Sequence, residues 1–541
     1  MKNTKYFTRS IIGSLFLVFI LSGCTKNFEE YNTNPKSLSS EQVGADYNLV
    51  SAFLQEAQRF IIPQTTGYQT GVNLASQSYC GYVANEAPFV SNMNNMTYAL
   101  QNGWINNVWS PRYTSVMNPT YKTIELAKEN PDFKDLDAFA RIIRVSAMSR
   151  VSEQLGPIIY SQYNVLNEAN NISYDTEPEL YMNYFQDLDI AINTLKSLVS
   201  TPVSPQMKKS DLAYETNNYE NWLRYANTLR LRLALRVVYV DPGMAKTQGE
   251  AALNPSNGGL LEDNAQNCFI KLSTTQPLNI IGYDWSDTRM NAQMESILGG
   301  FNDPRISKYF VPAEDPVVSG QYKGIRLGIE IDSKARYDFY SKLVFFTENT
   351  HQLMVAAESW FLRAEAALRG WANAGDAQTN YETGIARSFE MYEVSSALDS
   401  YLSDGSSKPK PYVDPKAVNP GENDVPQGSP HLSTITIKWE DGDSNDRKLE
   451  RIITQKWIAN FPDGEEAWAE YRRSGYPVLF PIVVNHSAGK IPTIPGIRRL
   501  HYPTSEYDTN TGGVEAAVAE IGGTDTGAPR LWWDVEDKSF K

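Results

Sequence analysis

Apolar side chains recur at steps of three and four residues through much of this chain, which is the spacing of one face of an α-helix. Four stripes of this kind occupy Leu180–Leu195, Trp222–Val237, Met354–Leu368 and Ala377–Phe389. Three further segments show the same spacing: 137–153, 446–460 and the stretch that begins at Glu465. The pattern predicts a mainly α-helical protein whose helices bury one face against one another.

The third and fourth stripes form a pair. Gly370 and the short turn 371–375 separate them, and small residues such as Ala357 and Ala364 stand at contact positions. Two antiparallel helices joined in this way resemble a tetratricopeptide unit. We therefore expect a tetratricopeptide-like helical-repeat scaffold with few short strands, the best candidate being Thr434–Trp439. Long, irregular, aromatic-rich insertions are expected at about 61–112, 254–345 and 402–433.

The N-terminus reads as a targeting segment. Basic residues precede an apolar run, Ile11–Leu21, which is too short to cross a bilayer as a helix but suits a signal peptide. The run ends in Leu21-Ser22-Gly23-Cys24, a bacterial lipobox, in which the cysteine is acylated and becomes the first mature residue. The alternatives are an uncleaved anchor or an ordinary signal peptide with a chance cysteine.

This interpretation predicts a signal peptide over 1–23, a lipidated Cys24 with a tether over 24–45, and one large domain over 46–541. Fatty chains such as palmitate on Cys24 would hold the protein on a membrane without a spanning helix. The other thiols, Cys80 and Cys268, are expected to be free and buried, although a disulfide between them stays open.

The charge balance excludes one class of partner. The chain has 63 acidic and 49 basic side chains, a net charge of −14. Binding to nucleic acid or to anionic lipid needs clustered lysine and arginine, so we predict no nucleic-acid partner.

Catalytic motifs are missing from the sequence. The four histidines are scattered, and no HExxH, CxxC, GxSxG or phosphate-binding Gly-Lys-Ser/Thr loop occurs. Asp441 and Asp443 imitate the start of a calcium loop, but Asp446 replaces the required glycine and Ile452 the bidentate glutamate. We predict no metal or other cofactor, with a structural Ca²⁺ open but unsupported. A glycoside hydrolase needs two carboxylates at defined separation, and no pair stands out, so we predict that the protein is not an enzyme.

Several strings resemble the SusD/RagB family of Bacteroidetes surface lipoproteins. The resemblance covers nearly the whole mature chain, and its strings are 152–160 (SEQLGPIIY), 302–310 (NDPRISKYF), 322–324 (YKG), 364–371 (AEAALRGW), 381–385 (YETGI), 455–459 (QKWIA), 466–473 (EAWAEYRR), 475–477 (GYP) and 498–503 (RRLHYP). Most of these strings also suit core packing. The arginines at 472, 473, 498 and 499 are expected to pair with acids.

This resemblance implies a non-catalytic lipoprotein on the outer membrane that faces the cell exterior. Such a protein caps a SusC-type TonB-dependent β-barrel transporter and captures oligosaccharides for uptake. The alternatives are a peptide-binding member of the same family and, less in keeping with the sequence, a surface glycoside hydrolase.

Physical chemistry indicates which residues could contact a glycan. A sugar ring has an apolar face of C–H groups and an equator of hydroxyls, so a matching site combines aromatic rings with amide, carboxylate and guanidinium groups. Two irregular segments offer that mixture, and we predict ligand contacts from Tyr82, Phe89, Trp104, Tyr283, Trp285, Asp287, Arg289 and Asn291. For both tryptophans, packing inside the fold is the competing interpretation. Tyr337 and Tyr340 are further candidates.

Overall fold

The computed structural model describes residues 48–215 and 218–540. The chain divides into two compact units, Met1–Ser51 and Ala52–Lys541. The described residues of the first unit form the start of helix α4 (Asn48–Arg59), and all features below belong to the second. The predicted signal peptide, Cys24, the tether and the boundary at residue 46 lie outside the described residues. No helix within the described ranges is long and apolar enough to cross a membrane.

The second unit is mostly helical, as predicted. Its long helices are α7 (Asn102–Arg112), α8 (Asn118–Glu129), α9 (Lys134–Leu155), α10 (Glu177–Leu198), α12 (Glu220–Arg236), α13 (Pro242–Leu253), α17 (Ala356–Leu368), α18 (Ala377–Met391), α20 (Asn445–Asn460), α21 (Gly464–Ser474) and α23 (Thr511–Glu520). Every apolar stripe in the sequence corresponds to one of these helices. The shorter ones are α5 (Thr65–Tyr68), α6 (Ser76–Tyr79), α11 (Pro205–Ser210), α14 (Pro277–Asn279), α15 (Ala292–Gly300), α16 (Ile306–Tyr309), α19 (Leu398–Leu402) and α22 (Thr504–Thr509).

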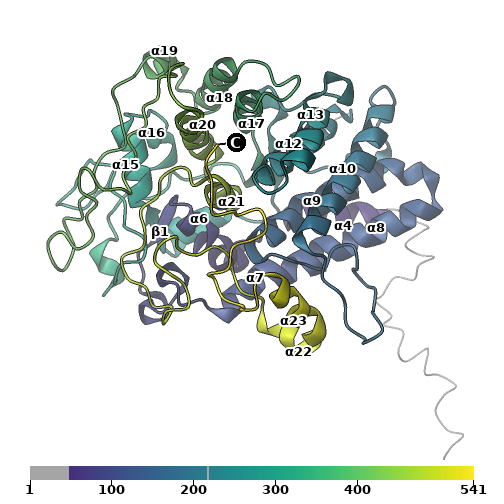
Figure 1. Ribbon diagram of the computed structural model, residues 1–541, viewed down its shortest axis with the longest axis horizontal. Helices are drawn as coiled ribbons and strands as arrows, with labels where there is room; N and C mark the ends of the chain where they lie inside the picture. Colours follow the sequence, from purple (N-terminus) through teal and green to yellow (C-terminus); the bar gives the residue numbers. More distant parts are fainter. Residues whose placement is uncertain (1–47, 216–217, 541) are drawn as a thin grey trace, which may run out of the picture. The chain divides into compact units, whose positions relative to one another are not determined.

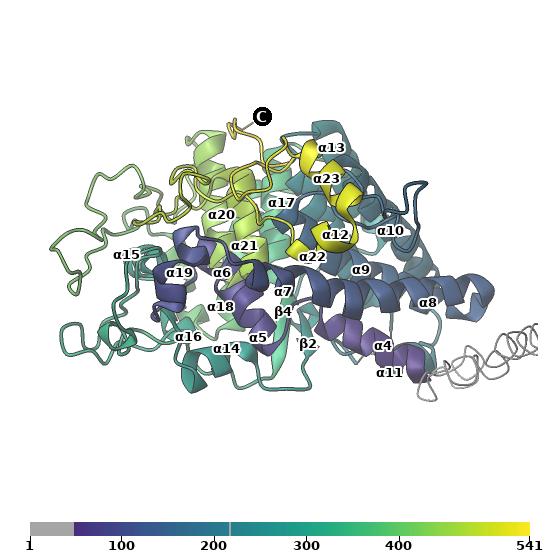
Figure 2. The same cartoon turned by 90° about the horizontal axis from the view of Figure 1, so that it is seen from below.

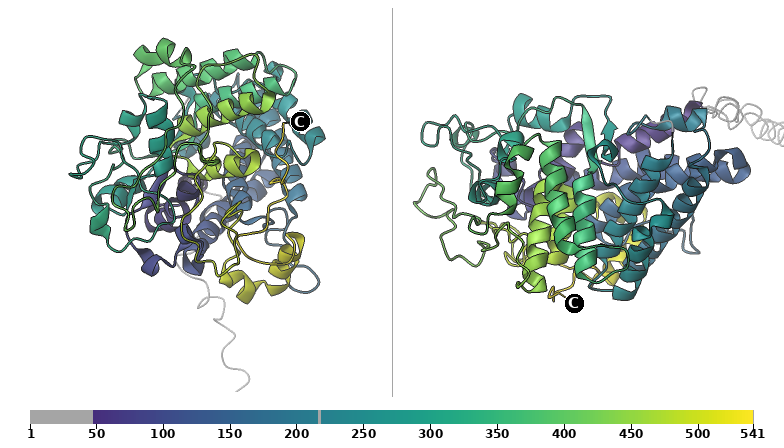
Figure 3. Two further views of the ribbon diagram at one scale, coloured as in Figure 1. Left: turned by 60° about the vertical axis from the view of Figure 1, so that its left-hand side comes forward. Right: turned by 90° about the horizontal axis from the view of Figure 1, so that it is seen from above.

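The long helices pack in sequence order as a frame. Helices α8 and α9, α9 and α10, α10 and α12, and α12 and α13 are neighbours, and α12 leads on to α17, which packs against α18 and α20. Figure 1 shows this series crossing the unit from α8 to α20, and the right-hand view of Figure 3 shows the helices standing side by side. The arrangement confirms the predicted tetratricopeptide-like scaffold.

The α17–α18 pair shows why these residues form a helical hairpin. Gly370 takes a φ of 69°, which favours glycine and ends the first helix. Asp376 then caps α18, since its carboxylate accepts a hydrogen bond of 2.8 Å from the backbone N–H of Thr379. A Cβ atom on Gly384 would lie 2.8 Å from the ring of Phe361, so only glycine permits this close approach of the helices.

Buried charges hold the middle of the frame together. Lys456 of α20 donates to Glu466 at 2.9 Å and to Glu470 at 2.8 Å, both on α21. Arg236 of α12 donates to Glu466 at 2.7 Å, and none of these side chains is more than 6% exposed. Such a network specifies which helix faces which, because any other packing would leave a charge buried without its partner.

Strands are few and short. Strand β1 (Val83–Asn85) pairs with β3 (Thr288–Met290), and β2 (Cys268–Lys271) pairs with β4 (Thr350–Met354), both antiparallel. The predicted strand at Thr434–Trp439 is wrong, because this segment neither forms a strand nor pairs with one within the described residues. Cys80 and Cys268 are free and buried, which leaves the disulfide alternative without support.

The three predicted insertions supply most of the irregular backbone. Helices α5, α6 and α7 lie within 61–112, and the segment 402–433 has little regular structure apart from an isolated bridge between Tyr412 and Val425. Figure 2 shows the irregular stretches between α15 and α20 projecting at the end of the unit opposite to α8. The irregular stretches after α15 thus lie at one end of the unit, whereas α7 of the first insertion packs against α9 of the frame.

Candidate functional site

The β1–β3 pairing brings the two predicted ligand-binding segments together. Val83 lies opposite Met290, Ala84 opposite Arg289 and Asn85 opposite Thr288. Phe89 and Trp104 follow β1 in the chain, whereas Tyr283 and Trp285 precede β3. Because the two strands are antiparallel, the segment that follows β1 and the segment that precedes β3 leave the same end of this small sheet.

Four of the predicted aromatic residues are partly exposed, and we call Phe89, Trp104, Tyr283 and Trp285 the aromatic surface. Phe89 and Trp104 meet edge to face, with ring centroids 6.0 Å apart and an interplanar angle of 87°. Trp104 stands in the first turn of α7, and Phe89 lies in a tight turn whose Val90 and Ser91 take φ values of 51° and 52°. The turn thus places Phe89 against the end of α7.

A band of polar side chains lies between Trp104 and Trp285. Asp287 accepts hydrogen bonds of 2.8 Å from both Gln69 and Lys334. The Lys334 ammonium also donates to the backbone carbonyl of Trp285. Next along the band, the Asn107 amide of α7 donates to the Thr70 hydroxyl at 2.7 Å. Amide, carboxylate and ammonium groups between aromatic rings match the hydroxyl groups and C–H faces of a carbohydrate.

A buried ion pair fixes the backbone beneath this band. Arg289 and Glu86 are fully buried, with 2.9 Å between Nη2 and Oε2. Arg289 also donates to the backbone carbonyl of Asp338 at 2.6 Å and to the Ser286 hydroxyl at 2.8 Å. Burial raises the pKa of the Glu86 carboxyl, and the charge of Arg289 offsets part of that rise. Arg289 therefore ties the Trp285 loop to the segment that carries Lys334.

Three of the predicted contact residues lie inside the fold, which corrects their assignment to the binding surface. Tyr82 is fully buried, and its hydroxyl donates to the carbonyl of Trp457. Arg289 forms the buried ion pair. Asn291, 3% exposed, caps α15 by accepting from Gln293 N–H at 2.8 Å and donates to the Val83 carbonyl at 3.0 Å. Irregular backbone leaves polar groups that these side chains must satisfy.

The structure corrects some further expectations and confirms others. Tyr337 and Tyr340 are buried in one hydrophobic cluster. Arg473, Arg498 and Arg499 pair with acids as predicted, at 2.6 Å in each case. Arg472 instead donates to backbone carbonyls and lies 3.6 Å from the centre of the Trp468 ring system.

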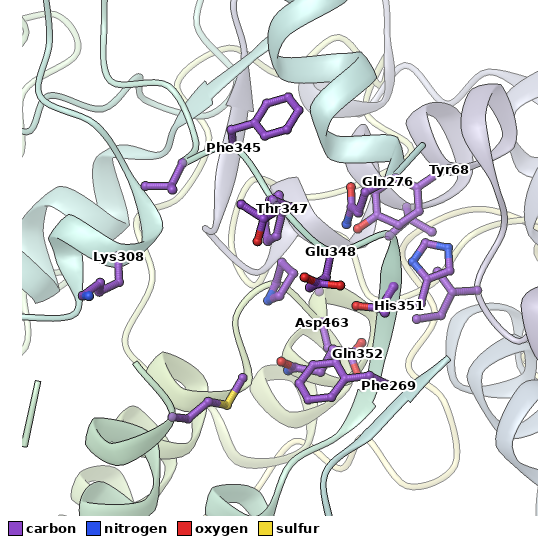
Figure 4. A pocket seen from close by; sticks show the side chains of 18 of the residues that line it. Tyr68, Phe269, Gln276, Lys308, Phe345, Thr347, Glu348, His351, Gln352 and Asp463 are labelled. Atoms are coloured by element: carbon purple, nitrogen blue, oxygen red, sulfur yellow. The ribbon is translucent and has the colours of Figure 1, made fainter. Parts of the chain in front are cut away.

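The aromatic surface continues into a cavity of about 490 Å³. The rings of Tyr283 and Phe345 meet edge to face at 5.4 Å, and Phe345, 53% exposed, stands at the cavity rim. Figure 4 shows the cavity with Lys308 and His351 on opposite sides. Its lining comes from α5, α16, α18, the β2–β4 strand pair, segment 344–348 and the start of α21. Sequence reasoning missed these residues, because no local pattern connects segments so far apart.

The cavity floor carries charges that are already paired. Asp463 accepts from Arg150 at 2.7 Å, and Glu465 accepts from Arg112 at 2.5 Å. His351 stacks on Tyr68 with centroids 5.6 Å apart, and burial, aided by the two arginines, lowers the pKa of its imidazole to about 3. The imidazole is therefore neutral near pH 7. The floor suits a neutral ligand, because its acids are committed to ion pairs.

Metal ligation has no candidate site in the ranges 48–215 and 218–540, where no group of three or more His, Cys, Asp or Glu side chains is arranged to hold an ion.

The family model described as SusD-like, "Susd and RagB outer membrane lipoprotein", matches residues 30–534. A chitin-binding SusD homolog from Flavobacterium johnsoniae is 38% identical over 91% of this chain and 99% of its own, with a TM-score of 0.83. A SusD homolog from Bacteroides uniformis is 35% identical over 91% and 100%, with a TM-score of 0.82. One from Bacteroides vulgatus is 32% identical over 92% and 100%, with a TM-score of 0.84. No curated protein matches.

The frame and its insertions are thus those of a helical-repeat family described as outer membrane lipoproteins. The chain belongs to the SusD-like family.

Proposed function

We propose that this protein binds oligosaccharides at the aromatic surface and delivers them, without turning them over, to a SusC-type TonB-dependent transporter. The observation that carries the proposal is the β1–β3 pairing, which sets exposed rings on either side of a polar band. The glycan most worth testing first is a chitin-type oligosaccharide, because the 38% identical homolog binds chitin. Its N-acetylglucosamine units are neutral, as the floor of the adjoining cavity requires.

The binding function is tested with the purified mature domain. An array that presents glycans beside oligopeptides should give binding to oligosaccharides alone, and calorimetry should then give the affinity of the best ligand. Incubation of that ligand with the protein should release no product. Binding to peptides in place of glycans would favour the peptide-binding alternative, and turnover would favour a hydrolase.

The location and partner are tested in cells. Cys24 is the proposed site of lipidation, so Cys24→Ala should abolish incorporation of labelled palmitate and release the protein from the membrane fraction. Protease added to intact cells should remove the anchored wild type, and its protection would argue against exposure on the exterior. A pull-down of the anchored protein should recover a large β-barrel; repeated failure to recover one would argue against delivery to a transporter.

A further inference from the structure

The cavity beside the aromatic surface has an exposed rim and a buried floor. Thr347 and Glu348 join Phe345 at the exposed rim. Tyr68 and His351, the stacked pair, are 4% and 3% exposed, and Gln276 beside them is 3% exposed. Tyr283 therefore connects an accessible side of the cavity to the aromatic surface through Phe345, and Lys308 is also exposed at the rim.

The floor is closed by tightly packed backbone. Gly464, which opens α21, lies so near to Gln77 of α6 that an added Cβ would come within 2.5 Å of its Cα. The neighbouring Asp463 and Glu465 are anchored by the buried arginines of α9 and α7. A polymer that passes through a groove needs an entrance and an exit. A cavity with a rim and a closed floor admits only the end of a chain.

The lining chemistry defines what that end must look like. Most of the wall is apolar, with Val72, Phe269, Phe346 and Met391 among its side chains. A bare sugar offers one apolar face and a full equator of hydroxyls, so it makes little apolar contact with the rest of such a wall. An N-acyl group exchanges one hydroxyl for an amide and adds a methyl group that the apolar wall can contact, while Gln276, Glu348 and Lys308 are placed to meet the amide and the remaining hydroxyls.

We propose that this cavity is a chain-end subsite, which takes the terminal N-acylated sugar of an oligosaccharide whose next units lie along the aromatic surface. The proposal rests on the proposed glycan-binding function and adds to it a preference for chain ends and for acyl groups. A cavity of this volume lies within the range that proteins use for small ligands.

The test uses two cavity variants and three probes. Phe269→Ala removes an aromatic wall, and Thr347→Trp fills the mouth from an exposed position, so that at least one variant should keep the native fold. The probes are the N-acetylglucosamine hexamer, the fully deacetylated hexamer, and insoluble chitin, which presents few chain ends per unit mass. Trp285→Ala serves as the matched variant on the aromatic surface.

Wild-type protein should prefer the acetylated to the deacetylated hexamer by about tenfold, as expected when a buried group loses its apolar contacts. Both cavity variants should lose about tenfold in affinity for the acetylated hexamer but stay within about twofold of wild type on insoluble chitin. Trp285→Ala should weaken both. Cavity variants that bind the hexamer normally, or that weaken both probes equally, would overturn the chain-end subsite alone. A wild type that binds no probe would overturn the chitin-type ligand and this subsite together.

Discussion

Glu86 and Arg289 form a fully buried ion pair directly beneath the loop that presents Trp285. The pair joins β1 to β3, and Arg289 extends it to Asp338 through hydrogen bonds. Its role is to hold the two halves of the aromatic surface in register. Its removal therefore affects both folding and binding.

Arg289→Met should lower the free energy of unfolding by about 1–3 kcal/mol, because it removes the buried hydrogen bonds to Asp338 and Ser286 and the partner of Glu86, whose pKa burial raises to about 8. Denaturation in urea measures this loss, and Lys308→Met, at an exposed position by the cavity, is the control. The double variant Glu86→Gln/Arg289→Met should recover part of the stability. A loss below about 1 kcal/mol for Arg289→Met would show that the pair does not stabilise the loop that presents Trp285.

Trp285→Ala and Trp104→Ala should each weaken oligosaccharide binding by about 1–3 kcal/mol, as the loss of an aromatic anchor does elsewhere. Calorimetry measures the change, and thermal unfolding checks that each variant is folded. Phe53→Ala, a partly exposed ring on α4, is the control and should bind as wild type does. Unchanged affinity in a folded Trp285→Ala would remove Trp285 from the site.

Lys456→Met should destabilise the frame by about 3–5 kcal/mol, since Glu466 and Glu470 would keep their charges while losing a cation at 2.9 and 2.8 Å. Lys448→Met on the same helix should cost less than about 0.5 kcal/mol, because its ammonium donates to the carbonyl of Asp441 near the surface and lies 5.8 Å from the centre of the Trp439 ring. Equal effects of the two substitutions would contradict a special role for the buried network.

Glu177 should make stability depend on pH. The Glu177 side chain is 4% exposed. One carboxylate oxygen accepts a hydrogen bond from Trp532 N–H at 2.8 Å, and the other has no hydrogen-bond partner among the described residues. Burial raises the pKa of this carboxyl to about 8 from an ordinary value of 4.5. The folded state keeps a proton that the unfolded chain releases above pH 4.5, so this contribution is full below that pH and is lost as pH rises towards 8.

The difference in unfolding free energy between wild type and Glu177→Gln isolates this group. It should fall by roughly 1 kcal/mol per pH unit between pH 5 and 8, with wild type losing stability relative to the variant. A difference that stays constant across this range would mean that Glu177 titrates normally.

The frame could be predicted from sequence because helical spacing is a local signal. The stripe Leu180–Leu195 became α10, and the hairpin of α17 and α18 needed only the alanines and Gly370 to be recognised. The failed strand at Thr434–Trp439 shows the limit. Ile435 and Ile437 are buried and alternate as in a strand, but Tyr381 donates to the carbonyl of Ile437 and Arg451 to that of Thr436. These side chains thus provide the hydrogen bonds that a neighbouring strand would otherwise provide.

The site was predictable only in part. Phe89, Trp104, Tyr283 and Trp285 are partly exposed, but Tyr82 and Asn291 have the same residue types in the same segments and lie inside. Residue composition identifies the two ligand-binding segments. Whether a given side chain in them is exposed depends on which backbone groups need a hydrogen-bond partner after folding. Six separate segments line the cavity, and a single sequence does not indicate that they lie close together in the fold.

The pairing of Val83 with Met290 closes a loop that encloses helices α7 to α14. Contacts of such long range form late in folding, after the local helices. A chain interrupted before β3 keeps Phe89 and Trp104 but has no aromatic surface, however well its helices form. Binding at the aromatic surface would therefore require the complete fold. A ligand bound there would in turn stabilise the β1–β3 pairing by mass action.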